Sequence, residues 1–310
     1  MNQTLEIELF KQTGKPLKLK NPLLLASGTC GYAIELNDFT DLTAPGAFIS
    51  KGTTLRAREG NPQPRIAEVK NGMLNAIGLE NIGINALVTE KAPAWQKMGL
   101  TVFVNIAGST IDEYAEIAMR LEGVEGIAGI EINISCPNVQ AGGVEFGLKP
   151  ETAAAVTSVV RKKTTLPIIV KLSPGSGRTG EIAQAAASAG ADAVTLINTF
   201  KGMVIDISTR RPLLGNITGG LSGPALKPVA LSMVYEAAGL IDIPIIACGG
   251  ISSAEDAIEF LMAGASAFQV GTAFMTEPSL PSKILSEIYK FFSEQNINNV
   301  EEIRGCARTR

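Results

Sequence analysis

The chain has 310 residues, of which 45% are hydrophobic and 18% charged, with a formal net charge of −3 at pH 7. The length suits one large barrel domain or two average domains, and the scattered charges exclude a surface built for nucleic acid or anionic lipid. Apolar runs fall far short of the roughly 20 residues of a membrane helix. Residues 1–10 lack a signal-peptide pattern, so we expect a cytoplasmic protein.

The sequence contains no histidine. Histidine is the usual general base and the commonest metal ligand, so proton chemistry in this chain requires another group. The four cysteines are scattered without a CxxC pair, which excludes a zinc or iron–sulfur cluster encoded by local spacing. In a reducing cytosol we expect free thiols.

The first twenty residues alternate on either side of a turn at 13–16, which predicts a β-hairpin. Short apolar runs then recur, mostly separated by helical sequence, and we expect eight of them to be strands: 23–26, 47–50, 102–104, 129–132, 168–170, 193–197, 245–248 and 267–270. Eight such units predict a closed (β/α)8 TIM barrel, an α/β fold, as a single domain over residues 1–310. A doubly wound open sheet is the alternative.

Two connections, residues 52–81 and 199–223, are too long to be plain loops. Both follow predicted strands, and the segments that follow barrel strands lie on the catalytic face. Long segments there usually fold over a ligand. We therefore predict long loops over the catalytic face.

Barrel sites are assembled from residues at the carboxyl ends of the strands. The residues at these ends include three asparagines, two lysines and two glycine turns: Ser27-Gly28-Thr29, Lys51-Gly52, Asn105, Asn133, Lys171, Asn198-Thr199, Gly249-Gly250 and Gly271-Thr272. The two glycine turns, after the seventh and eighth strands, suit phosphate binding through backbone N–H groups. Tight turns without a ligand are the alternative for each.

Asparagine offers an acceptor and two donors without charge, which matches the polar edge of an isoalloxazine ring. Lysine adds positive charge where such a ring gains electrons. The set therefore predicts flavin mononucleotide (FMN), with its phosphate at strands seven and eight and its ring across the barrel mouth. Taken singly, Lys51 or Lys171 would more often be an exposed strand-end lysine, so the prediction depends on the whole set.

Residues 175–180, GSGRTG, fit the GxGxxG fingerprint of dinucleotide-binding folds. That fingerprint needs an acidic residue near the end of the next strand to bind a ribose, and this chain has Asn198 there. Ser173 and Pro174 also separate the first glycine from the strand. We predict a mobile βα loop instead of a dinucleotide site.

Cys136 lies beyond the fourth predicted strand, in a loop with Pro137 and the pair Gly142-Gly143. With histidine absent, its thiol is the best-placed proton acceptor, if its pKa falls below the reference of about 8.5 or the pH is raised. A base beside a flavin indicates proton removal alpha to a carbonyl, coupled to hydride transfer from the neighbouring carbon. Cys248, by contrast, is expected to be a buried small hydrophobe.

Six strings occur in order along the chain: SKGTT (50–54), REGNPQPR (58–65), NAIGLENIG (75–83), INISCPNV (132–139), INTFKGMVID (197–206) and NITGGLSGPALKPVAL (216–231). With them the chain resembles the dihydroorotate dehydrogenase family over nearly its whole length. The last two strings resemble the class 1B branch, which is associated with NAD as final acceptor. The resemblance implies oxidation of dihydroorotate to orotate in pyrimidine biosynthesis.

The resemblance also implies roles for named residues. Cys136 is expected to be the catalytic base that takes the C5 proton, while the flavin accepts hydride from C6. The expected substrate-binding residues are Lys51, Asn75, Ala76, Ile77, Gly78, Leu79, Asn133, Asn198 and Thr199. The expected FMN-binding residues are Ser27, Lys51, Gly52, Asn105, Asn133, Lys171, Ile197, Gly223, Gly249, Gly250, Gly271 and Thr272.

Class 1B resemblance further implies an electron-transfer subunit with FAD and a [2Fe–2S] cluster, in a heterotetramer built on a homodimer of this chain. No metal site is expected in the chain itself. Three alternatives remain open: a fumarate-linked dihydroorotate dehydrogenase, a Schiff-base lyase that uses Lys171 as nucleophile, and a non-catalytic sensor of a phosphate-bearing ligand.

Overall fold

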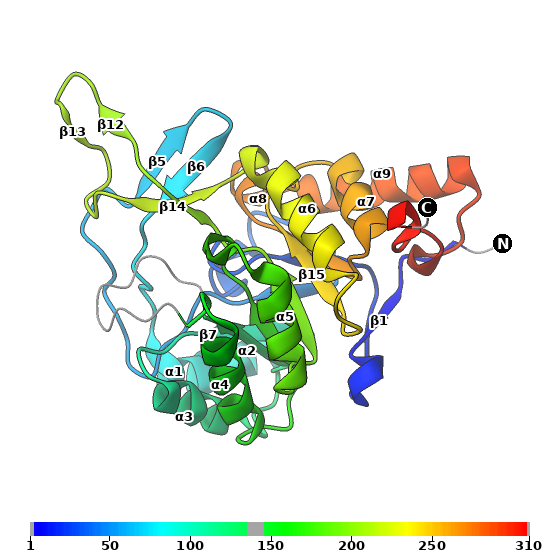
Figure 1. Ribbon diagram of the computed structural model, residues 1–310, viewed down its shortest axis with the longest axis horizontal. Helices are drawn as coiled ribbons and strands as arrows, with labels where there is room; N and C mark the ends of the chain where they lie inside the picture. The colour runs from blue at the N-terminus through cyan, green and yellow to red at the C-terminus, as the bar shows by residue number, and fades with distance from the viewer. Residues whose placement is uncertain (1–2, 135–145, 309–310) are drawn as a thin grey trace.

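The computed structural model describes residues 3–134 and 146–308. Its centre is a closed barrel of eight parallel strands with helices around it (Figure 1). This confirms the predicted (β/α)8 fold and excludes the alternative of a doubly wound open sheet. Each of the eight predicted runs forms one barrel strand. Their bounds are β3 (Leu23–Leu25), β4 (Ala47–Ile49), β7 (Val102–Ile106), β8 (Gly129–Asn133), β9 (Ile168–Lys171), β10 (Ala193–Leu196), β15 (Ile245–Cys248) and β16 (Ala267–Val270).

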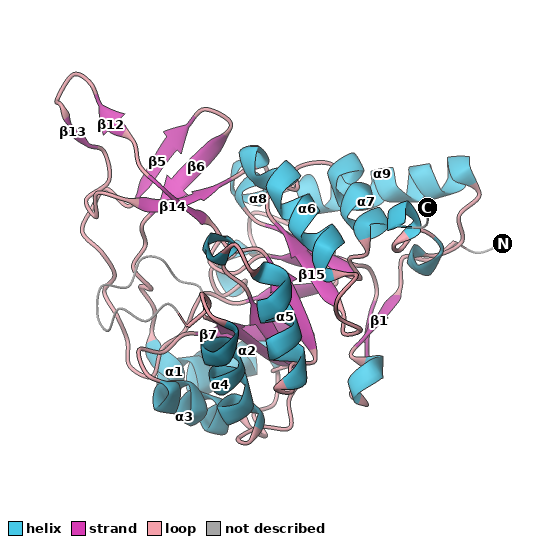
Figure 2. Ribbon diagram, viewed as in Figure 1, coloured by secondary structure: helices cyan, strands magenta, loops and turns pink. Residues whose placement is uncertain are grey.

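The helices cover the outside of the barrel, as Figure 2 shows in cyan. They are α1 (Gly83–Ala86), α2 (Ala92–Met98), α3 (Ile111–Leu121), α4 (Pro150–Arg161), α5 (Thr179–Ser188), α6 (Lys227–Ala237), α7 (Ala254–Ala263), α8 (Thr272–Thr276) and α9 (Leu280–Gln295). Helix α3 illustrates why these segments are helical. Thr110 caps its amino end by accepting a hydrogen bond from the Glu113 N–H at 3.2 Å, and its apolar face is buried. Within the described ranges, no helix combines the length and apolar character of a membrane span.

The predicted N-terminal hairpin is confirmed as β1 (Ile7–Leu9) paired antiparallel with β2 (Leu17–Leu19). It packs at the amino ends of the barrel strands, where the ring of Phe10 meets Phe103 edge-on with centroids 5.9 Å apart. Lys15 from the same hairpin donates to Asp192, which directly precedes β10. The hairpin therefore covers the end of the barrel opposite to the strand carboxyl ends.

The two long connections lie over the catalytic face, as predicted, and both contain short strands. They contribute β5 (Ile66–Val69), β6 (Gly72–Asn75), β11 (Phe200–Gly202) and β14 (Gly219–Ser222) to one antiparallel sheet in the order β11-β14-β6-β5. A two-stranded arm of β12 (Ile205–Asp206) and β13 (Arg211–Pro212) projects beyond it (Figure 1). The small sheet has its own core of Ala67, Leu74, Ala76 and Leu214, which holds the two connections together.

Asp192 provides a test of what stabilises the amino end of the barrel. Its side chain is 3% exposed and accepts hydrogen bonds from Lys15 at 3.0 Å, Arg161 at 2.9 Å and the Ile168 N–H at 2.7 Å. Asp192→Asn removes the charge that both cations face, so we expect the free energy of unfolding to fall by about 3 kcal/mol in a denaturant titration. Glu181→Gln, in an exposed ion pair with Arg178, is the control and should leave stability unchanged. Equal losses in both variants would contradict this assignment.

Candidate active site

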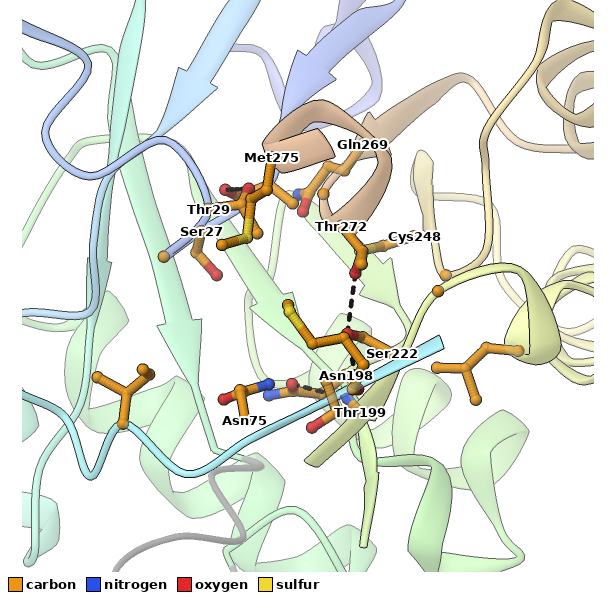
Figure 3. A pocket seen from close by; sticks show the side chains of 18 of the residues that line it. Ser27, Thr29, Asn75, Asn198, Thr199, Ser222, Cys248, Gln269, Thr272 and Met275 are labelled. Atoms are coloured by element: carbon orange, nitrogen blue, oxygen red, sulfur yellow. Dashed lines mark hydrogen bonds between the residues drawn. The ribbon is translucent and has the colours of Figure 1, made fainter. Parts of the chain in front are cut away.

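A cavity of about 290 Å³ lies at the carboxyl ends of the barrel strands, between the barrel and the small antiparallel sheet. Side chains from both layers line it, as Figure 3 shows for Ser27, Cys248 and Gln269 from the barrel side and for Asn75 and Ser222 from the sheet side. The carboxyl ends of parallel barrel strands are where such folds build their sites. The cavity therefore lies where the predicted barrel fold places a binding site.

Most of the predicted site residues line this cavity. They are Ser27, Lys51, Gly52, Asn75, Ile77, Gly78, Leu79, Asn105, Asn133, Lys171, Ile197, Asn198, Thr199, Gly223, Gly249, Gly250, Gly271 and Thr272. Ala76 does not line it: this residue is fully buried in the core of the small sheet, and its N–H donates to the carbonyl of Arg65 at 2.7 Å. Cys136 lies outside the described residues.

Three asparagine side chains form a row of amides along the cavity. Asn198 donates to Asn133 at 3.4 Å, and Asn133 donates to Asn105 at 3.4 Å. Asn105 in turn donates to the buried carboxylate of Glu131 at 2.7 Å, which fixes its amide with the oxygen toward Asn133. The row places uncharged donors and acceptors side by side, as recognition of a planar heterocycle requires.

Lys171 is the buried cation of the cavity wall, with 4% of its surface exposed. Its Nζ lies 3.3 Å from Ser27 Oγ, 3.5 Å from Gln269 Oε1 and 3.9 Å from Glu131 Oε1. Burial by itself lowers the pKa of Lys171, but attraction to Cys248 in its ionised form and to the carboxylate of Glu131 outweighs burial and holds the pKa above the ordinary lysine value. Lys171 is therefore positively charged at neutral pH.

The opposite wall comes from the segment after β6. Asn81 anchors it, since its side chain donates to the Leu79 carbonyl at 2.7 Å and to Thr54 Oγ1 at 2.8 Å. Lys51 reaches this segment and lies 4.0 Å from the carboxylate of Glu80, which also pairs with Arg65. The wall thus carries a second cation, Lys51, partly neutralised by a side chain of the segment that it faces.

The remaining end of the cavity is built from glycine turns and hydroxyl groups. Gly249 and Gly250 have φ of 127° and 77°, conformations that favour glycine, and a side chain at Gly250 would collide with the Lys227 backbone at 2.5 Å. Thr272 donates to Ser222 at 2.8 Å across the same end (Figure 3). Close backbone approach together with hydroxyl donors suits a phosphate group.

Known proteins resemble this chain in sequence and in fold. The family model described as dihydroorotate dehydrogenase matches residues 10–292. The chain belongs to this family. It is 50% identical to the protein of Geobacter sp. (strain M21) named "Dihydroorotate dehydrogenase B (NAD(+)), catalytic subunit", over 94% of this chain and 95% of that protein. A protein of Desulforudis audaxviator with the same name is also 50% identical, with the same coverage.

A solved dihydroorotate dehydrogenase from Eimeria tenella, in complex with ferulenol, has the same fold. The TM-score is 0.80, with 22% identity, and the match covers 99% of this chain and 89% of the other. At this identity the likeness concerns the fold alone. Together with the family match, it makes the barrel described above a dihydroorotate dehydrogenase barrel.

Sequence reasoning missed Glu131 and Gln269, which pack beside Lys171 in this member of the dihydroorotate dehydrogenase family. A signal was available for both. Each is a polar residue between two apolar neighbours in its strand, in GIEIN and AFQV, and both are buried. Because buried polar groups need partners, such residues indicate an internal polar cluster.

Two other interpretations change with the structure. Cys248 is only partly buried and lines the cavity, so the prediction of a buried hydrophobe was wrong. The raised pKa of Lys171 disfavours the Schiff-base lyase, because a nucleophilic lysine must lose its proton. The GxGxxG segment contributes no residue to the cavity lining.

Cys30 offers a test of burial near the site. Its thiol is buried, lies 3.2 Å from the Ile49 carbonyl, and has its pKa raised by burial to about 12. At pH 8 only about one such thiol in 10,000 would be ionised, so we expect Cys30 to resist iodoacetamide while the exposed Cys306 is modified. Mass spectrometry of peptides gives the result, and denaturation before labelling is the control. Labelling of Cys30 at the rate of Cys306 in the native protein would contradict the assignment.

Proposed function

We propose that this chain is the catalytic subunit of an NAD-linked dihydroorotate dehydrogenase, which oxidises (S)-dihydroorotate to orotate in pyrimidine biosynthesis. The observation that carries this proposal is the 50% identity to curated subunits of that name over 94% of the chain. The cavity supports it, because a row of amides and two lysines suit an anionic pyrimidine ring and a planar cofactor in one pocket.

FMN fits the residues that line this cavity. Lys171 supplies a buried cation, the asparagine row supplies amide partners, and the turns at Gly249-Gly250 and Gly271-Thr272 supply a phosphate end. Gly28 lines the cavity, and an added Cβ there would meet no protein atom within 4 Å, so the space beside this residue is open. Bound FMN would accept hydride from the substrate. We assign its binding to the twelve residues predicted for it, as part of a single domain of residues 1–310.

Substrate binding is assigned to Lys51, the segment of residues 75–79, Asn133, Asn198 and Thr199. Lys51 would pair with the substrate carboxylate, and the amides would bind the polar ring edge. Within residues 75–79, Ala76 faces the small sheet, so its contribution is to hold the backbone of its neighbours. Gly220 allows Thr199 to sit close, because an added Cβ would lie 2.1 Å from Thr199 Oγ1.

Cys136 is proposed as the base that takes the C5 proton. The support is its place in the chain: Asn133, three residues earlier, lines the cavity, and three residues of chain span at most about 11 Å. The absence of histidine from the sequence leaves a thiol as the natural proton acceptor in this loop. Lys51 and Lys171 add positive potential at the cavity, which favours a thiolate nearby.

Replacement of Cys136 tests its role directly. In Cys136→Ala we expect the flavin to stay bound while its bleaching by dihydroorotate slows by at least about 100-fold, because only the proton acceptor is lost. Cys136→Ser should bleach slowly, with a pH profile moved upward, because a hydroxyl has a far higher pKa than a thiol. Stopped-flow absorbance in single turnover measures both. Normal bleaching in Cys136→Ala would remove Cys136 from the reaction.

A partner subunit is part of the proposal. The curated relatives are named as catalytic subunits, which implies another subunit in their enzymes. Within residues 3–134 and 146–308, no group of three or more His, Cys, Asp or Glu side chains is placed to bind a metal ion. We infer a partner with FAD and a [2Fe–2S] cluster, in a cytoplasmic heterotetramer built on a homodimer of this chain.

One assay tests the proposed function as a whole. The purified chain is given dihydroorotate and NAD, alone and after co-expression with an iron–sulfur flavoprotein of the same organism. We expect flavin bleaching in both samples and NADH formation only with the partner. Turnover with fumarate in place of NAD would favour the fumarate-linked alternative, and a colourless protein that never oxidises dihydroorotate would contradict the proposal.

A further inference from the structure

We propose that Glu131 is a positioning residue for the redox site, which orients Lys171 and balances its charge toward the bound flavin. The inference rests on the proposed function, because it concerns the flavin in the same cavity. Glu131 belongs to no motif that the proposed function uses, and it does not line the cavity. Its effect would pass through Lys171, which does.

Glu131 lies in the middle of β8 and its side chain is inside the barrel, with no exposed surface. Three neutral donors converge on its carboxylate from three different strands. Thr195 of β10 donates at 2.8 Å, Gln269 of β16 at 2.9 Å and Asn105 of β7 at 2.7 Å. The carboxylate is thereby held rigidly in place from across the barrel.

The geometry links this carboxylate to Lys171 in two ways. Glu131 Oε1 lies 3.9 Å from Lys171 Nζ, close enough for a strong charge interaction but too far for a hydrogen bond. Gln269 bridges the two, since its amide nitrogen donates to Glu131 while its amide oxygen accepts from Lys171 at 3.5 Å. The orientation of the Gln269 amide, and with it the acceptor offered to Lys171, therefore depends on the carboxylate.

A carboxylate at this position lowers the stability of the fold. Interiors of such barrels are usually filled with bulky apolar side chains, and a buried charge destabilises the fold unless it is paired and hydrogen-bonded. A neutral side chain could satisfy part of the same donor set. What only a carboxylate supplies is negative charge behind a cation that faces the cavity.

At neutral pH, Glu131 is the negative charge that acts on Lys171. The titratable groups that act on it are Glu131 from β8, Cys248 at the end of β15 and Cys30 from the segment after β3. Burial raises the pKa of both thiols, so at neutral pH these sulfurs are uncharged. Without Glu131, burial of Lys171 would be opposed by little, and its ammonium would lose its proton more readily.

The test uses the yellow holoprotein and its flavin midpoint potential as a function of pH. In Glu131→Gln, an unbalanced ammonium should shift the potential to more positive values at low pH. As the pH rises and Lys171 loses its proton, the midpoint potential of this variant should fall. The unaltered protein should not show this fall. Thr195→Val is the matched control, because it removes one hydrogen bond to Glu131 and leaves the charges in place, so its potential should follow the unaltered protein.

A second measurement covers a Glu131→Gln variant that folds poorly. The free energy of unfolding is determined for Glu131→Gln, Lys171→Met and the double variant. If Glu131 acts on Lys171, the loss caused by Glu131→Gln should be clearly smaller in the Lys171→Met background. An equal loss in both backgrounds, or a potential that keeps the original pH profile in Glu131→Gln, would overturn the inference.

These outcomes separate the inference from the proposed function. A protein that is bleached by dihydroorotate but shows no effect of Glu131→Gln on the potential retains its function and loses only the role of Glu131. A protein that binds no flavin fails both proposals. In that case the stability cycle would still show whether the two buried charges are coupled, but no redox role would remain for Glu131.

Discussion

Closure of the parallel barrel is the constraint on which the rest of this structure depends. Hydrogen bonding of all eight strands in one direction brings residues from distant parts of the sequence to a single rim. Asn105, Asn133 and Asn198 can form one row only because β7, β8 and β10 end side by side or nearly so. The same closure encloses Glu131, whose hydrogen-bond donors come from three other strands. Site and buried polar cluster are thus two consequences of one topology.

The barrel was predictable because buried parallel strands carry continuous apolar runs, and the strand ends then indicated the cavity lining. The small sheet was not predictable, because its pairs join residues as far apart as Asn75 and Gly220 through strands of three or four residues. Local sequence specifies a turn well but not such a partner. Ala76 was misplaced for the same reason: only the sheet determines which side chains of that segment face the cavity.

The two ends of the barrel differ in what their residues do. At the amino ends, Asp192 accepts hydrogen bonds from the hairpin, α4 and β9. At the carboxyl ends, glycine turns and polar side chains leave a cavity. Stability and chemistry are therefore met by different residues. This separation lets the site keep features that a stable core would avoid, such as the backbone conformations at Gly249 and Gly250.

The buried pair of Glu131 and Lys171 is the clearest such feature. Removing two charges from water costs free energy that their attraction rarely repays, so well-packed apolar residues would stabilise the barrel at least as well. Its position suggests the reason for keeping it. A lone buried ammonium would lose its proton, and an exposed one would be screened by water; a buried carboxylate behind the ammonium keeps it charged where screening is weak. In the proposed function the cavity binds anions and accepts electrons, so a dependable positive charge there would outweigh the loss in stability.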